Sequence, residues 1–213
     1  MSEPRETETQ RVYDILKARI LQNQLPAGMP LSHSQLCRDL HTSRTPVREA
    51  LSRLEGLGLV TTIPRRGTIV AKLGLQDFLE IGQILAQLEP FAARHAAGRI
   101  APATLDLFET QLRALHHLPP TAATIEQLNQ IDNAIHRAIL EVAGNRRLYE
   151  LVETMRSLCD HLSFALERRF DIVVDELLTL LQALRSGDGT EAEQIMAHHI
   201  TSFGEALRTT SGR

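Results

Sequence analysis

The order of apolar and polar residues follows a helical period along most of this chain. Val12, Leu16 and Ile20 recur every four residues, so we predict a first helix that starts near residue 9. Beyond residue 75 the period continues, interrupted by glycine and proline and without any strand pattern. It predicts six further helices, at about 75–98, 101–117, 122–143, 145–170, 172–187 and 189–209. Six such helices favour an antiparallel bundle.

The segment between residues 31 and 70 has a different pattern. The run Ser32-His33-Ser34-Gln35 is a capping box that predicts the start of a short helix. Pro46 is tolerated only in a first helical turn, so a second helix must begin just before it. Two short strands then follow, joined by a basic turn, at residues 59–63 and 68–71. We predict a helix-turn-helix followed by a two-stranded wing.

The second of these helices carries the candidate chemistry for DNA recognition. Arg44 and Arg48 are four residues apart and share one face at its start. A guanidinium can donate two hydrogen bonds to guanine, and the N–H groups at a helix start bind phosphate, so we predict base contacts by both arginines. A solvated charged helix beside an ordinary hairpin is the alternative, which the complete order of elements disfavours. Residues expected at phosphate or sugar, or at the closely approaching wing, are Ser34, Ser43, Thr45, Arg66 and Gly67.

Several motifs in these residues resemble the winged helix of GntR-family bacterial transcription regulators. They are Leu25-Pro26-Ala27-Gly28, Ser43-Arg44-Thr45-Pro46-Val47-Arg48-Glu49-Ala50-Leu51, Leu54-Glu55, Gly58-Leu59-Val60 and Arg66-Gly67. The remainder is similar to the all-helical, FCD-type effector domain of the FadR/VanR branch, and six effector helices point to the VanR-like subgroup. The resemblance implies a homodimer that binds a near-palindromic operator on double-stranded DNA. The commonest pattern in the family is repression relieved by a small organic acid.

Charge is divided unevenly along the chain. The formal net charge is −3, yet residues 1–71 hold 10 Lys+Arg against 7 Asp+Glu, and residues 72–213 hold 13 against 19. This division is expected if only the first part contacts phosphates. Cys37 and Cys159 lie far apart on predicted helices, which suits reduced thiols. We found no signal peptide or long apolar span, so we expect a cytoplasmic protein with no membrane association.

Polar residues interrupt two apolar faces of the predicted bundle. Asp132 and His136 lie within the apolar face of the helix at 122–143, and His199 lies on the inner face of the last helix. An aspartate and two histidines could bind zinc, nickel or manganese. From spacing alone, a buried Asp–His hydrogen bond with an unrelated histidine nearby is the preferred alternative. His161 could substitute as a ligand, although a partly exposed helix position is the simpler interpretation.

The resemblance raises the metal hypothesis, because the branch carries metal ligands where this chain has Asp132, His136 and His199. The fourth ligand position falls on Leu177, and Leu85 occupies the place of a usual pocket arginine. We therefore expect one of two arrangements. Either three protein ligands hold a metal whose shell the effector or water completes, or a metal-free pocket accepts a more apolar effector than a carboxylate. The predicted effector pocket comprises Leu85, Asp132, His136, Leu177 and His199.

These patterns favour a regulator that is not an enzyme, with residues 1–71 as a winged helix-turn-helix domain, 72–76 as linker and 77–213 as a helical effector-binding and dimerisation domain. One rival hypothesis is a metal-dependent enzyme that uses Asp132, His136 and His199. Such an enzyme needs an adjacent acid or base, and the apolar faces show none. A second rival is a DNA-binding dimer without an effector, whose pocket is collapsed.

Overall fold

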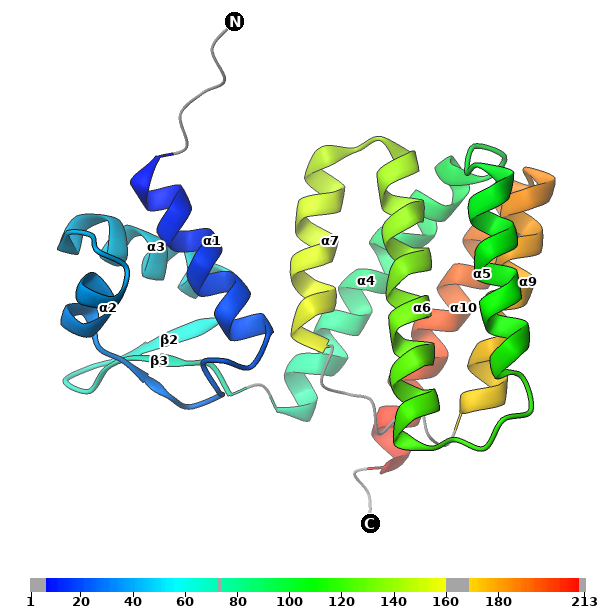
Figure 1. Cartoon of the computed structure of the whole chain (residues 1–213). Helices are drawn as coiled ribbons and strands as arrows, with labels where there is room; N and C mark the ends of the chain where they lie inside the picture. Colours follow the sequence, from blue (N-terminus) through cyan, green and yellow to red (C-terminus); the bar gives the residue numbers. More distant parts are fainter. Residues whose placement is uncertain (1–6, 73, 160–168, 211–213) are drawn as a thin grey trace, which may run out of the picture. The chain divides into compact units, whose positions relative to one another are not determined.

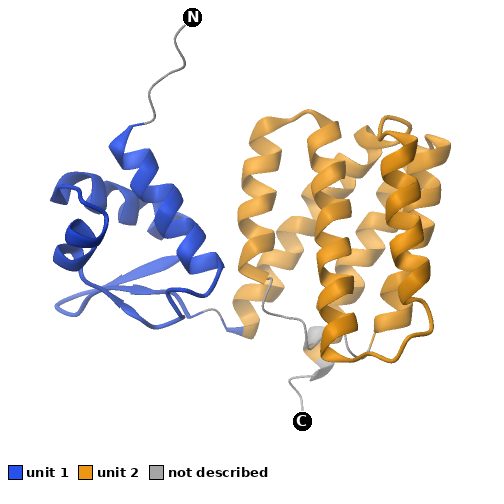
Figure 2. Ribbon diagram, in the orientation of Figure 1, with its two compact units in different colours: residues 1–74 blue, residues 75–213 orange. Residues whose placement is uncertain are grey.

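The computed structural model of the protein describes residues 7–72, 74–159 and 169–210. The chain forms two compact units, residues 1–74 and 75–213 (Figure 2). Each unit has its own buried apolar residues and its own secondary structure (Figure 1).

Three helices and a small sheet make up the first unit. The helices are α1 (Glu8–Leu21), α2 (His33–Asp39) and α3 (Arg44–Gly56). The side chain of Ser32 accepts a hydrogen bond from the backbone N–H of Gln35 and so caps α2, as the capping-box pattern predicts. Along α3 the residues at a helical spacing are buried, namely Val47, Ala50, Leu51 and Leu54. Because these residues anchor one face of α3 in the core, the opposite face is exposed to solvent.

The sheet of the first unit has three antiparallel strands in the order β1-β3-β2. They are β1 (Pro30–Leu31), β2 (Val60–Ile63) and β3 (Gly67–Val70). The hairpin of β2 and β3 was predicted, with Thr62 opposite Thr68. The strand β1 was not predicted, because two residues are too few to show an alternating pattern. We call residues 60–70 the wing.

Helices alone make up the described part of the second unit. They are α4 (Leu75–Ala96), α5 (Pro102–Leu115), α6 (Ala122–Ala143), α7 (Arg146–Cys159), α9 (Phe170–Ser186) and α10 (Gly189–Thr210). Gly144 and Gly187 end two of them with a positive φ of 74° and 80°, a conformation that glycine adopts without strain. Pro90 lies inside α4 and is buried, so the helix lacks one backbone hydrogen bond there.

The mainly helical fold predicted from the sequence is confirmed, with corrections at element boundaries. The helix predicted over residues 145–170 is described only as far as Cys159, and residues 160–168, including His161, lie outside the described residues. The helix α9 begins at Phe170, two residues earlier than predicted. Within the described ranges, no helix is both apolar enough and long enough to span a bilayer.

Candidate functional site

The start of α3 presents two free cations. The side chains of Arg44 and Arg48 are exposed. Within the described ranges neither guanidinium makes a hydrogen bond or an ion pair. Ser43 is the N-cap residue of α3, but its side chain accepts no capping hydrogen bond, so its hydroxyl is also available. The core residues of α3 hold this surface in place, because they anchor the opposite face of the helix.

The wing presents a second pair of exposed arginines. The backbone N–H of Arg66 donates to the carbonyl oxygen of Ile63 at 3.0 Å and closes a turn over Pro64. Arg65 has a φ of 65°, and Pro64 precedes it, an arrangement typical of a type II turn. Gly67 follows with a φ of 88°. The turn therefore holds Arg65 and Arg66 at the end of the hairpin, where both are exposed.

Other residues predicted at this surface are also accessible. Thr45 is exposed in the first turn of α3, and Ser34 is exposed in the first turn of α2. The hydroxyl of Ser34 lies 3.1 Å from that of Ser32. Together with the four arginines, these hydroxyls and the N–H groups at the start of α3 form a surface suited to a polyanion.

The second unit contains a buried cluster of possible metal ligands. One ligand atom each from Asp132, His136 and His199 lies within 4.8 Å of the others. The sequence pattern indicated these three residues, and they come together because α4 packs against both α6 and α10. The Nε2 atom of His199 lies 3.1 Å from Oδ1 of Asp132, and the Nε2 atom of His136 lies 3.4 Å from the same oxygen.

Both histidines are oriented by a carboxylate on the far side of the ring. The Nδ1 atom of His136 is hydrogen-bonded to Oε2 of Glu89 from α4, and the Nδ1 atom of His199 lies 2.9 Å from Oε2 of Glu176 from α9. A carboxylate at Nδ1 fixes the ring and directs the lone pair of Nε2 toward a metal. The Nε2 atom of His136 is buried and has no hydrogen-bond partner in the described part of the chain. This unpaired acceptor and the donor set fit a divalent transition metal.

Two partly buried arginines complete the polar cluster. Arg156 from α7 donates to Oε1 of Glu89 at 3.2 Å and to Oδ2 of Asp132 at 2.7 Å. Arg169, at the start of α9, donates from Nη2 to Glu176 at 2.6 Å and to the hydroxyl of Ser202 at 2.8 Å. The Nη1 atom of Arg169 is buried and makes no hydrogen bond to any residue that the structure describes. One guanidinium thus bridges the two carboxylates of α4 and α6, and the other keeps a free donor.

The pKa values in the cluster follow from competition between burial and charge. Burial alone would raise the pKa of Glu89, but His136 and Arg156 lower it to about 2. Asp132 has the same opposing causes, and its pKa lies well below the usual value. Burial would lower the pKa of His199, yet Asp132 and Glu176 raise it to about 9. A proton on His199 therefore competes with any metal for Nε2.

The structure places more charged residues around the predicted effector pocket than the sequence analysis expected. Leu85 and Leu177, which the sequence analysis placed in the effector pocket in place of polar residues, are 5% and 0% exposed and belong to the hydrophobic core. Sequence reasoning found no acid or base beside the ligands, which was wrong. The residues that it missed are Glu89, Arg156, Arg169 and Glu176. Glu89 could have been found, because it follows Leu85 by one helical turn on a buried face.

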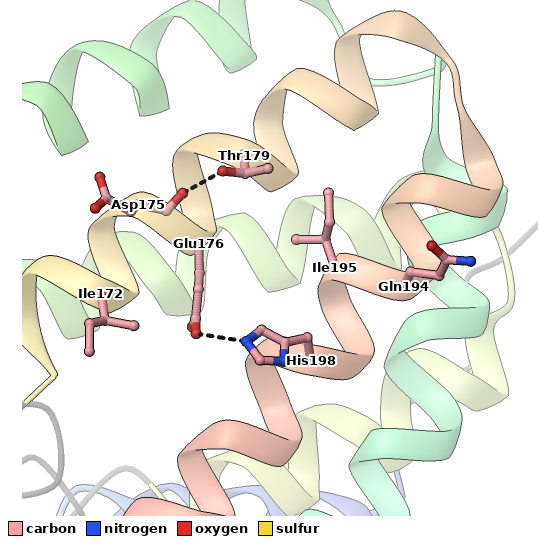
Figure 3. Close-up of a pocket in the computed structure, with 7 residues that line it drawn as sticks. All are labelled: Ile172, Asp175, Glu176, Thr179, Gln194, Ile195 and His198. Carbon is pink, nitrogen blue, oxygen red and sulfur yellow. Dashed lines mark hydrogen bonds and ion pairs between the residues drawn. The ribbon is translucent and has the colours of Figure 1, made fainter.

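A groove of about 490 Å³ lies between α9 and α10 (Figure 3). Glu176 and His198 face each other across it, with Nε2 of His198 3.6 Å from Oε1 of Glu176. Because Glu176 also binds His199, one carboxylate contacts both the groove and the buried cluster. The volume is in the range of small-molecule sites.

Comparison with known proteins relates both units to known families. Residues 8–70 match the family model "Bacterial regulatory proteins, gntR family", and residues 80–202 match the FCD domain. The chain is 26% identical to the HTH-type transcriptional repressor RspR of Escherichia coli, across 96% of this chain and 91% of that protein. It is also 26% identical to a probable D-xylose utilization operon transcriptional repressor of Paenarthrobacter nicotinovorans, across 98% and 92%.

A solved structure supports the fold. A putative GntR transcriptional regulator from Rhodococcus superposes with a TM-score of 0.71 at 19% identity, and the match covers 96% of this chain and 99% of that one. At this identity the likeness concerns the fold alone.

Proposed function

We propose that this chain, which belongs to the GntR family of bacterial regulatory proteins, is a homodimeric repressor. Its second unit carries an FCD domain. Two copies of α3 would enter the two halves of a near-palindromic operator, because a two-fold dimer requires two related half-sites. Repression agrees with the names of two relatives, both called repressors. A small ligand in the FCD domain would lower the affinity for the operator.

The free arginines carry the DNA-binding part of the proposal. Arg44 and Arg48 are exposed at the start of a helix whose other face is buried, and no described residue neutralises them. Arg65 and Arg66 add two cations at the wing. An arrangement of this kind allows base contacts in the major groove and phosphate contacts beside it.

DNA binding is tested with a duplex selected from random sequence by the wild-type protein. Arg48→Ala should weaken binding by about 1–3 kcal/mol for each arginine–base pairing that it removes, and should relax the preference at one position in each half-site. Fluorescence anisotropy and a repeated selection would measure both effects. Arg146→Ala, which changes a side chain 74% exposed in the second unit, is the matched control and should bind as wild type. Wild-type selectivity in Arg48→Ala would contradict the base-contact assignment.

The buried cluster supports a divalent metal as part of the ligand site. Asp132, His136 and His199 would hold the ion, and Glu89 and Glu176 would orient the two imidazoles. A bound ion would supply a Lewis-acidic centre with open coordination positions. Since only three protein ligands are present among the described residues, we infer that the effector or water completes the shell.

The charges around the cluster favour an anionic effector. Three carboxylates face two guanidiniums, so a divalent ion held by neutral imidazoles would leave one net positive charge. A monocarboxylate would cancel that charge. The Nη1 atom of Arg169, which has no partner among the described residues, could donate to it. This arrangement favours a small organic acid over the more apolar effector that the two leucines suggested.

Metal content and thermal shift test the ligand site. Purified wild-type protein should contain zinc, nickel or manganese, and Asp132→Asn should lose it. The asparagine keeps the side-chain volume, so the variant should fold. A panel of acetate, lactate and gluconate should raise the midpoint of thermal unfolding only when metal is present. Equal metal content in both proteins would contradict metal binding. A shift by apolar compounds alone would contradict the anionic effector.

The enzyme alternative gains no support from the newly found acids. Glu89 is bound to His136 and Arg156, and Glu176 is bound to His199 and Arg169. Because each carboxylate is held by two cationic or hydrogen-bonding partners, neither is free to act as a general base. Ligand stabilisation without turnover of the ligand would agree with a regulator.

A further inference from the structure

The last turn of α3 is joined to the wing by one side chain. Oε1 of Glu55 accepts a hydrogen bond of 2.6 Å from the backbone N–H of Thr62. Thr62 lies in β2, which is an edge strand of the sheet β1-β3-β2. An edge strand leaves its outward N–H groups without a strand partner, so the Glu55 carboxylate supplies one. Thr62 pairs with Thr68, and the next pair, Ile63 with Gly67, closes the wing turn.

The helix α3 does not itself require a carboxylate at this position. An acidic side chain in the last helical turn lies at the negative end of the helix dipole, which is unfavourable for the helix. A negative charge beside a DNA-binding surface also opposes binding of a polyanion. Both effects disfavour a carboxylate at position 55. The hydrogen bond from Thr62 is the favourable interaction of Glu55 that offsets them.

A second, weaker connection reaches the same pair of wing residues from α2. The ring Nε2 of His33 lies 3.4 Å from the hydroxyl of Thr68, and this hydroxyl lies 3.4 Å from that of Thr62. The side chain of Thr68 is buried, with the residue 5% exposed. The base of the wing is therefore held from α3 by Glu55 and from α2 by His33, close to the turn that carries Arg65 and Arg66.

We propose that Glu55 is a positioning residue for DNA binding. It fixes the wing on α3, so that Arg65 and Arg66 contact the DNA backbone when Arg44 and Arg48 occupy the major groove. The inference rests on the proposed DNA-binding function. It assigns Glu55 no contact with DNA, and it predicts that removal of a negative charge weakens the binding of a polyanion.

The experiment compares Glu55→Ala, Glu55→Gln and Asp39→Ala on the selected duplex. Asp39 is an exposed acid on α2 whose carboxylate accepts from Gln35, so its removal changes the unit's charge equally without a wing contact. Glu55→Ala should weaken binding and reduce the slope of log K against log salt by about 0.9 for each phosphate that is no longer bound. Glu55→Gln keeps an oxygen acceptor and should bind nearly as wild type, whereas Asp39→Ala should bind equally or more tightly.

A double-mutant cycle separates positioning from a general effect on folding. In an Arg65→Ala/Arg66→Ala background, Glu55→Ala should cause no further weakening, because the arginines that it positions are already absent. In an Arg48→Ala background its effect should remain in full. An unchanged salt slope in Glu55→Ala, or an equal weakening in both backgrounds, would refute the positioning role. A wild-type protein that selects no duplex would instead refute the proposed function, and this inference with it.

Discussion

The two units differ in the exposure and pairing of their charged side chains. In the first, Arg44, Arg48, Arg65 and Arg66 are exposed and have no ion-pair partner among the described residues. In the second, Arg156 is 15% exposed and binds two carboxylates, and His136 is fully buried. A surface that binds a polyanion gains from free cations that can adapt to the phosphates. A site for a small ligand requires side chains held in one geometry, which burial and mutual hydrogen bonds provide.

The largest expected effect tests this difference through stability. Arg156→Met should lower the free energy of unfolding of the second unit by about 3–5 kcal/mol, because it leaves the carboxylates of Glu89 and Asp132 buried without their cation. Arg48→Met, the matched change on the exposed surface, should alter stability by less than about 0.5 kcal/mol. Urea denaturation followed by circular dichroism would measure both. Similar destabilisation of the two variants would remove the distinction.

The free energy of unfolding of the metal-free protein should also depend on pH, because the buried charged groups of the second unit titrate. This effect should be smaller than that of Arg156→Met. The pKa of His199 is raised to about 9 from an ordinary value of 6.5, so its stabilising contribution is complete below pH 6.5 and is lost as the pH rises to about 9. The decrease in the free energy of unfolding should amount to at most about 3 kcal/mol. Glu89, with a pKa of about 2, contributes above pH 4.5 and loses that contribution as the pH falls toward 2.

Denaturation of the chelated protein at constant ionic strength would measure this profile. His199→Gln should flatten the alkaline decline between pH 6.5 and 9, whatever its effect on absolute stability. An alkaline decline of equal size in His199→Gln would assign the titration to another group.

The smallest effect concerns backbone strain at the wing turn. Arg65 adopts a φ of 65°, which costs a residue with a Cβ atom about 1 kcal/mol relative to glycine. Arg65→Gly should therefore raise the unfolding midpoint of the first unit slightly and weaken binding of the selected duplex. His117→Gly relieves a φ of 68° in the second unit and should leave DNA binding unchanged. Tighter duplex binding by Arg65→Gly would show that this arginine does not contact DNA.

More of the candidate site could be predicted from the sequence in the first unit than in the second. The exposure of the arginines on α3 and the wing could be predicted from the sequence. Their spacing along one helix and one turn determines which face they occupy. In the bundle, Asp132 and His136 were found on one helix for the same reason. Glu89, Arg156 and Glu176 come from three other helices and meet at the cluster only after folding. The sequence pattern alone does not distinguish a charged residue that is buried with a partner from one that is exposed to solvent.

The position of Pro90 has a mechanical consequence. The first part of α4, from Leu75 to Glu89, is continuous helix and ends at the carboxylate that binds His136. At a rise of 1.5 Å per residue this segment is about 21 Å long. Pro90 cannot donate a backbone hydrogen bond to the carbonyl oxygen of Ala86, so the helix bends most easily in the turn that ends at Pro90. A bend of about 5° at that point would move the amino end of the segment by about 2 Å. A rearrangement of charge around one imidazole would then reach the far end of the helix as a displacement comparable to a van der Waals radius.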